Sequence, residues 1–310
     1  MILHSGFKAA FWTPVLVLAV FGLILAANLI PTDMLGLREN PYLAVVVIEL
    51  MIYAVPSLFY CRIRGREFTP KLRLRLFPPS QLLYLLQAFL FLSSVTVILS
   101  VLLYRIAPEA FTSSSVTEYA AFAFGDRFFD GLYLVVAFAV LPALTEEFLF
   151  RGVVIGEYEK YGAPLAAFVS AAMFAMSHFS LARFPVYFVA GLVLASVLYA
   201  TRSLLAAILV HACYDAAVVL GERTVLYIAD KQNISMLLLV ILLCAVALFS
   251  GMLMCFEAQH IYRGYAEANV PTGYEAKDKR SPFARIAEAF FTPTFLVLVL
   301  VFVVAAVAGH

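Results

Sequence analysis

The stretch TEEFLFRG, residues 145–152, places two adjacent carboxylates and one arginine inside a long apolar run that covers residues 131–155. A charged side chain at the centre of a membrane helix costs about 2.5–3.5 kcal/mol on insertion scales. Three such side chains in one span therefore need a compensating role. One role is a buried Glu–Arg pair that locks a helix bundle, and the other is a carboxylate held in a dry cavity for catalysis or transport. We expect both roles, each filled by a different member of this trio.

The composition of the whole chain is that of a polytopic membrane protein. Of its 310 residues, 64% are hydrophobic and only 13% are charged, and the mean hydropathy is +0.96. Soluble globular domains are about one quarter charged, so the lipid bilayer is the expected surrounding of this chain. Its net charge is +1 and no basic domain is present, so nucleic acid is not an expected partner. None of the four cysteines forms a CxxC pair, which indicates neither a structural zinc site nor a disulfide framework.

Apolar segments of about 20 residues, the length of a membrane-spanning helix, predict an all-α bundle of about nine transmembrane helices. The predicted segments are 9–30, 41–61, 81–104, 131–155, 164–179, 184–200, 204–220, 234–256 and 289–308. The first is too long for the apolar region of a signal peptide, so we expect it to remain as a helix. Residues 131–220 form a four-helix core between an N-terminal part, 1–130, and a C-terminal part, 221–310. Polar loops are expected at 105–130 and 221–233, and a mixed-charge segment with some helix at 257–288.

The orientation in the membrane follows from a basic segment, residues 62–75, which contains six Lys and Arg side chains. Short basic loops stay on the cytoplasmic side. The segments 157–161 and 257–288 then also face the cytoplasm, and the loop 105–130 faces outward.

Ionisable residues gather in the four-helix core rather than being scattered over all spans. They are Glu146, Glu147, Arg151, His178, His211 and Asp215, and only Glu49 falls in an outer span. Glu147 and Arg151 are four residues apart and share one helix face, whereas Glu146 is rotated by about 100° from Glu147. We therefore predict that Glu147 is the structural partner of Arg151 and that Glu146 is free for chemistry. Glu49 is expected to be a packing or rim carboxylate.

The histidines and Asp215 are expected at a similar depth. At about 1.5 Å per residue, Glu146, His178, His211 and Asp215 lie roughly 15, 20, 11 and 17 Å from the inner ends of their helices. Phe174 shares a face with His178, as His211 does with Asp215. A cavity shared by three helices would explain this placement.

These three motifs, Glu146-Glu147-x-x-x-Arg151, Phe174-x-x-x-His178 and His211-x-x-x-Asp215, resemble those of the CPBP family. This group of CAAX-protease and bacteriocin-processing membrane proteins, also called the ABI family, includes the Ras-converting CAAX endopeptidases. The resemblance covers residues 131–220 and implies an intramembrane protease in the cell membrane. Its peptide or membrane-protein substrate would be a CAAX-type protein, a leader peptide or a segment of a membrane protein.

The resemblance also implies roles for the residues. Glu146 would activate a water molecule with the help of His178, and His211 and the residue at 215 would stabilise the oxyanion. Glu147 and Arg151, with Phe174, would support the site. Some members carry Asn where this chain has Asp215. The side-chain amide of Asn donates a hydrogen bond at any pH, whereas the carboxyl group of Asp donates one only when it is protonated.

Two questions stay open at this stage. Many members are named metalloproteases, and Glu146, His178, His211 and Asp215 are possible zinc ligands, although we expect catalysis without a metal. The alternative to a protease is a non-proteolytic scaffold or immunity factor, or a proton-coupled carrier that uses Glu146 and His178.

Overall fold

A computed structural model describes residues 9–27, 29, 46–108, 132–133, 135–231, 234–271 and 275–309. These residues form helices, joined by turns, and no strand occurs among them. The outer helices are α1 (Ala9–Ala27), η1 (Leu50–Ala54), α3 (Val55–Arg64), η2 (Arg66–Leu72), η3 (Pro79–Gln81), α4 (Leu82–Tyr104), α12 (Ile234–Glu267), α13 (Pro282–Phe290) and α14 (Pro293–Ala308). The core helices are η5 (Val136–Val140), α7 (Leu141–Glu147), η6 (Phe148–Val154), α8 (Ile155–Tyr158), η7 (Glu159–Tyr161), α9 (Ala163–Met176), α10 (Phe184–Thr201) and α11 (Leu204–Lys231).

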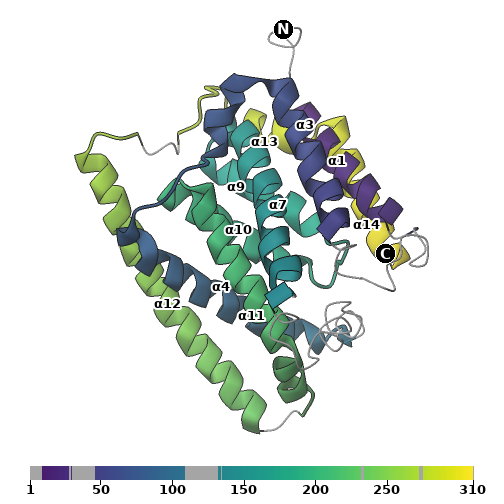
Figure 1. Ribbon diagram of the computed structural model, residues 1–310, viewed down its shortest axis with the longest axis vertical. Coiled ribbons are helices and arrows are strands. Elements are labelled where there is room, and N and C mark those ends of the chain that lie inside the picture. Colours follow the sequence, from purple (N-terminus) through teal and green to yellow (C-terminus); the bar gives the residue numbers. More distant parts are fainter. Residues whose placement is uncertain are drawn as a thin grey trace.

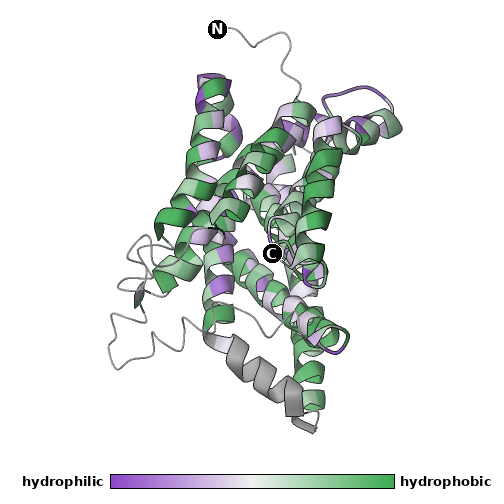
Figure 2. Cartoon of the chain, turned by 90° about the vertical axis from the view of Figure 1, so that its right-hand side faces the viewer, coloured by the Kyte–Doolittle hydropathy of each residue, from purple (hydrophilic) through white to green (hydrophobic). Residues whose placement is uncertain are grey.

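The all-α membrane bundle is confirmed. Five described helices are long and apolar enough to cross a bilayer, and the pair α13–α14, bent by 53°, would make a sixth. Two shorter apolar helices, α9 and the part of α11 up to Val219, add to the core. Hydrophobic residues cover most of the length of these helices (Figure 2). The protein is therefore an integral membrane protein.

Several predicted helix ends were wrong. The segment 221–233 was expected to be a loop, but α11 continues to Lys231 and α12 continues to Glu267. Both extensions lack proline, so a helix can continue where the sequence turns polar. The last span begins at Pro293 rather than at residue 289, because proline is favoured at the first position of a helix and disrupts its interior. Residues 41–45 and most of the loop 105–130 lie outside the described part of the chain.

The core helices pack against the outer helices on two sides. Helices α4 and α12 lie side by side along one edge of the molecule, and α10 packs against both α4 and α9 (Figure 1). On the other side, α1 packs against α14. The residues of the four-helix core are thereby enclosed from two directions.

The charged residues of three segments meet at one end of the bundle. Arg64 on α3 pairs with Glu157, which is 2% exposed, and Arg73 pairs with Glu159. Glu288 on α13 lies 3.9 Å from Lys160. The segments 62–75, 157–161 and 257–288, all predicted to face the cytoplasm, therefore lie on the same side of the membrane.

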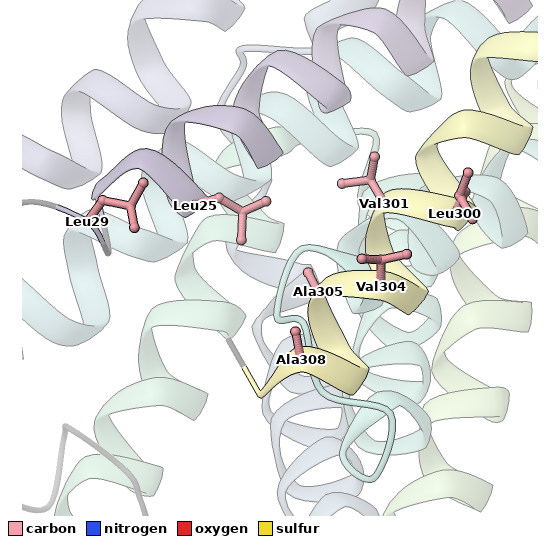
Figure 3. A pocket seen from close by; sticks show the side chains of 7 residues that line it. All are labelled: Leu25, Leu29, Leu300, Val301, Val304, Ala305 and Ala308. Atoms are coloured by element: carbon pink, nitrogen blue, oxygen red, sulfur yellow. The ribbon is translucent and has the colours of Figure 1, made fainter.

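A groove of about 410 Å³ with an apolar lining separates the C-terminal ends of α1 and α14. Side chains from the end of α1 and from α14 face each other across it, as Figure 3 shows for Leu25 and Val304. Among the described residues, those that line this groove are all Leu, Val or Ala.

Helices α9 and α10 pack closely at Gly191. A Cβ atom at this position would lie 2.7 Å from Cα and 2.8 Å from Cβ of Ala171, and the backbone of Ala171 cannot move aside. We expect Gly191→Ala to destabilise the protein by about 1–3 kcal/mol, because it overpacks this contact. Thermal unfolding in detergent measures the effect. Gly22→Ala on α1, with no atom within 4 Å of the added methyl group, is the control. An equal unfolding temperature for the two variants would contradict the prediction.

Candidate active site

The helix that carries Glu146 and Glu147 is locally widened on both sides of them. Pro142 lies at the start of α7 and has no N–H group to donate, so the preceding turn is disrupted. The π-helical segments η5 and η6 come directly before and after α7. Such segments are frequent at functional sites. In η6, the carbonyl of Phe150 accepts a hydrogen bond of 2.8 Å from Ser170 Oγ, which fixes this irregular turn against α9.

Glu147 and Arg151 form a fully buried ion pair. Arg151 Nη1 lies 2.8 Å from Glu147 Oε1, and neither side chain is exposed. Arg151 Nη2 also donates to the carbonyl of Gly191 at 3.2 Å, and the guanidinium carbon lies 4.5 Å from the centre of the Phe174 ring. The arginine therefore ties α7 and η6 to α9 and α10.

His211 on α11 contacts three carboxylates. Its Nδ1 atom lies 2.9 Å from Glu147 Oε1, the same oxygen that Arg151 contacts. Its Nε2 atom lies 3.4 Å from Asp215 Oδ2 and 3.8 Å from Glu146 Oε2. Glu147 thus fixes one edge of the imidazole ring, and the other edge points to the space between Glu146 and Asp215.

His178 follows the end of α9 and is held by two contacts. Its Nδ1 atom lies 2.9 Å from the carbonyl oxygen of Phe174. Because a carbonyl only accepts hydrogen bonds, Nδ1 carries the proton and Nε2 keeps the lone pair of the neutral ring. The ring stacks on Tyr187 at 3.7 Å between centres. Phe174 lies between the two histidines, 4.9 Å from His178 and 5.7 Å from His211.

The four residues predicted to be catalytic, together with Phe174, line one cavity of about 210 Å³. Its lining consists of Phe138, Pro142, Glu146, Phe174, His178, Arg183, Tyr187, Ala190, His211, Tyr214, Asp215, Val218 and Val219. Glu147 and Arg151 do not line it. The structure thus separates an ion pair that supports the site from the Glu146, His178, His211 and Asp215 side chains that face the cavity.

The sequence did not predict the position of Glu49. Thr145 Oγ1 lies 3.2 Å from Glu49 Oε1, which brings this carboxylate from the second helix to the residue next to Glu146. In the sequence, Glu49 is a single acidic residue in an apolar span. This pattern does not reveal which residue of another helix its side chain contacts.

The side chains of the cavity do not form the ligand set of a metal site. Within the described part of the chain, no group of three or more His, Cys, Asp or Glu side chains is arranged to hold a metal ion. Both ring nitrogens of His211 face carboxylates, and Nδ1 of His178 is engaged with Phe174. No step of the proposed reaction is assigned to a metal ion.

Comparison with known proteins supports the resemblance of the motifs. Residues 128–217 match the family described as Rce1-like, type II CAAX prenyl endopeptidases. No curated protein and no solved structure matches this chain. The matching residues carry Glu146, His178, His211 and Asp215, and they cover nearly the same range as the predicted core. Residues 128–217 are therefore similar to the type II CAAX prenyl endopeptidases of this family.

Proposed function

We propose that this protein is an intramembrane endopeptidase that hydrolyses a peptide bond with water activated by Glu146 and His178. The observation that carries the proposal is the convergence of these residues with His211 and Asp215 on one cavity. Peptide hydrolysis needs a base beside the attacking water and a donor directed at the developing oxyanion. The cavity brings both kinds of group together.

In the proposed mechanism, the water lies between Glu146 and Nε2 of His178. Glu146 removes one proton as the water oxygen attacks the carbonyl carbon, and the lone pair on His178 Nε2 accepts a hydrogen bond from the other. The Nε2–H group of His211 donates to the oxyanion, and Glu147 holds this ring through Nδ1. Glu146 then passes its proton to the leaving nitrogen as the C–N bond breaks. Asp215 orients His211 from one helical turn away.

The substrate class follows the family, whose name refers to prenylated CAAX proteins. A CAAX-type protein, a leader peptide and a membrane-protein segment all present a peptide bond at the membrane. We place the enzyme in the plasma membrane, with the basic segment 62–75 on the cytoplasmic side.

Cleavage in water enriched in ¹⁸O tests the proposal. Purified protein in lipid should release peptide products in which the new carboxyl group carries one ¹⁸O atom per cleavage, as mass spectrometry can measure. A scaffold, an immunity factor or a proton-coupled carrier would release no such product. Absence of cleavage across a broad peptide library would favour that second class of function.

The effect of substituting Asp215 distinguishes a metal-free reaction from a zinc-dependent one. We expect Asp215→Asn to keep activity within about tenfold, because Asn can accept from His211 and donate to the oxyanion. Chelators should leave the wild-type rate unchanged. Rates with and without chelator, together with the zinc content of the purified protein, provide the measurement. Stoichiometric zinc that is lost in Asp215→Asn, together with activity, would contradict the expectation.

A further inference from the structure

Helix α13 carries polar side chains on the side that faces the protein and large apolar side chains on the opposite side. Tyr161 Oη donates a hydrogen bond of 2.7 Å to Glu288 Oε1, and Arg285 Nη1 donates one of 3.1 Å to the carbonyl of Tyr161. Phe283 and Ile286 lie on the opposite face by the helical period, and they are 80% and 45% exposed. A surface helix of a soluble protein has the reverse orientation.

The junction between α13 and α14 gives α13 a fixed direction, inclined to α14. The two helices are bent by 53° relative to each other. At the junction, the hydroxyl group of Thr292 accepts a hydrogen bond from the N–H group of Phe295, which caps α14. The same hydroxyl group donates a hydrogen bond of 3.0 Å to the carbonyl of Ala10 on α1. Helix α13 therefore does not continue the direction of the apolar helix that follows it.

The residues before α13 place it at the polar end of the bundle. Arg280, whose side chain is about half exposed, pairs with Asp278 at 2.6 Å and also with Glu288. The N–H group of Asp278 donates a hydrogen bond of 2.9 Å to the carbonyl of Lys160, in the turn where the charged residues of three segments meet. Helix α13 lies at this end of the bundle (Figure 1). Charged groups are costly in hydrocarbon, so this end belongs at the headgroup layer.

The exposed apolar surface of α14 continues onto α13. Leu296 and Leu300 are exposed on α14, as expected for side chains that face lipid, and Phe291, between the two helices, is 70% exposed. Because acyl chains cover the exposed side of α14, the acyl carbons next to the headgroups are the apolar phase nearest to α13. Lipid therefore fits the apolar face of α13 without a second protein.

The charges around α13 favour anionic headgroups. Residues 275–290 contain four Lys or Arg and three Asp or Glu side chains, and two of the acids, Asp278 and Glu288, pair with Arg280. Lys277 and Lys279 are exposed. The basic segment 62–75 lies at the same end of the bundle. Helices that combine lysines with large apolar side chains bind anionic membrane surfaces.

We propose that α13 lies in the headgroup layer, with Phe283 and Ile286 among the first acyl carbons and Lys277 and Lys279 on the headgroups of anionic phospholipids. This inference concerns a lipid-binding surface and does not depend on the proposed endopeptidase function. The hydrogen bonds of α13 to η7 connect this surface to the end of the helical segment that carries the proposed catalytic base.

Fluorescence quenching measures the depth of the apolar face. The four native cysteines are replaced by serine, and the protein with Phe283→Cys is labelled with bimane in vesicles of phosphatidylcholine and phosphatidylserine. We expect strong quenching by lipids that are brominated on the acyl chain and little quenching by aqueous iodide. Glu275→Cys, on the exposed segment before α13, is the matched control and should show the reverse.

Two outcomes of this measurement would overturn the inference. Equal quenching by iodide at the two positions would place the apolar face of α13 in water. Quenching at position 283 by neither agent would show that protein, from a second copy or another chain, covers the face instead of lipid.

The same label tests the choice of headgroup. Spin-labelled phosphatidylserine and phosphatidylcholine quench only a label that lies next to them, and we expect stronger quenching by phosphatidylserine. Lys279→Gln should reduce this preference by about fivefold, the usual contribution of one basic residue at an anionic surface. Arg263→Gln removes the same charge from an exposed position on α12, well away from α13 in Figure 1, and should keep the preference. Equal quenching by both lipids, or the same loss in both variants, would contradict the proposed lipid contact.

Discussion

Glu146→Gln is expected to lower the rate of peptide hydrolysis by about 10²–10⁴-fold, the usual contribution of a general base. Gln has nearly the same shape as Glu but cannot take a proton from water. Glu146 lines the cavity and makes no ion pair with Arg151, and its carboxylate lies 3.8 Å from His211 Nε2. The unfolding temperature of the variant should therefore stay close to that of the wild type.

The neighbouring carboxylate supplies the control for this prediction. Glu147→Gln makes the same replacement, an amide for a carboxylate, at the adjacent residue. Glu147, however, is fully buried between Arg151 and His211. It should lower the unfolding temperature as well as the activity. Single-turnover rates and thermal unfolding of both variants separate the two roles. Full activity in Glu146→Gln, or equal destabilisation by both changes, would disprove the assignment.

Arg151→Met is expected to reduce the free energy of unfolding by about 3–5 kcal/mol, the usual cost of breaking a buried ion pair. Methionine fills part of the space but leaves Glu147 without its guanidinium partner. His211 still contacts Glu147 at 2.9 Å, so the loss should fall at the lower end of this range. Unfolding in mixed detergent micelles measures the difference.

A double variant tests whether the unpaired charge is the cause. Glu147→Gln combined with Arg151→Met removes both charges, so much of the lost stability should return. Activity should stay low, because His211 loses the carboxylate that fixes its ring. A double variant no more stable than Arg151→Met would show that lost packing, rather than an uncompensated charge, determines the effect.

The parts of the site that could be predicted lie within single helices. The Glu147–Arg151 pair follows from a spacing of four residues, and the different orientation of Glu146 follows from the helical period. Contacts across helices were not predictable in this way: the hydrogen bond from His211 to Glu147 joins residues 64 positions apart. For the same reason, the contact between Glu49 and Thr145 could not be predicted. The wider turns of η5 and η6 also escaped prediction, because apolar spacing does not distinguish them from a regular α-helix.

The ends of the helices show a second limit. Polarity marks where a chain leaves the hydrocarbon layer, but a helix can continue into water. The sequence 221–231 has no proline to stop it, and α11 continues through it. At residues 290–293 a proline is present, and the helix does end there.

The shortness of α9 has a consequence for the supply of water. Its 14 residues span roughly 21 Å, whereas the hydrocarbon layer is about 30 Å thick. Helix α9 therefore ends at Met176 before it can cross, and His178 follows it into a turn whose backbone needs polar partners. A membrane compensates for such hydrophobic mismatch by local thinning. Thinning above α9 would bring the aqueous phase towards the cavity, so we expect the proposed hydrolysis to become slower in lipids with longer acyl chains.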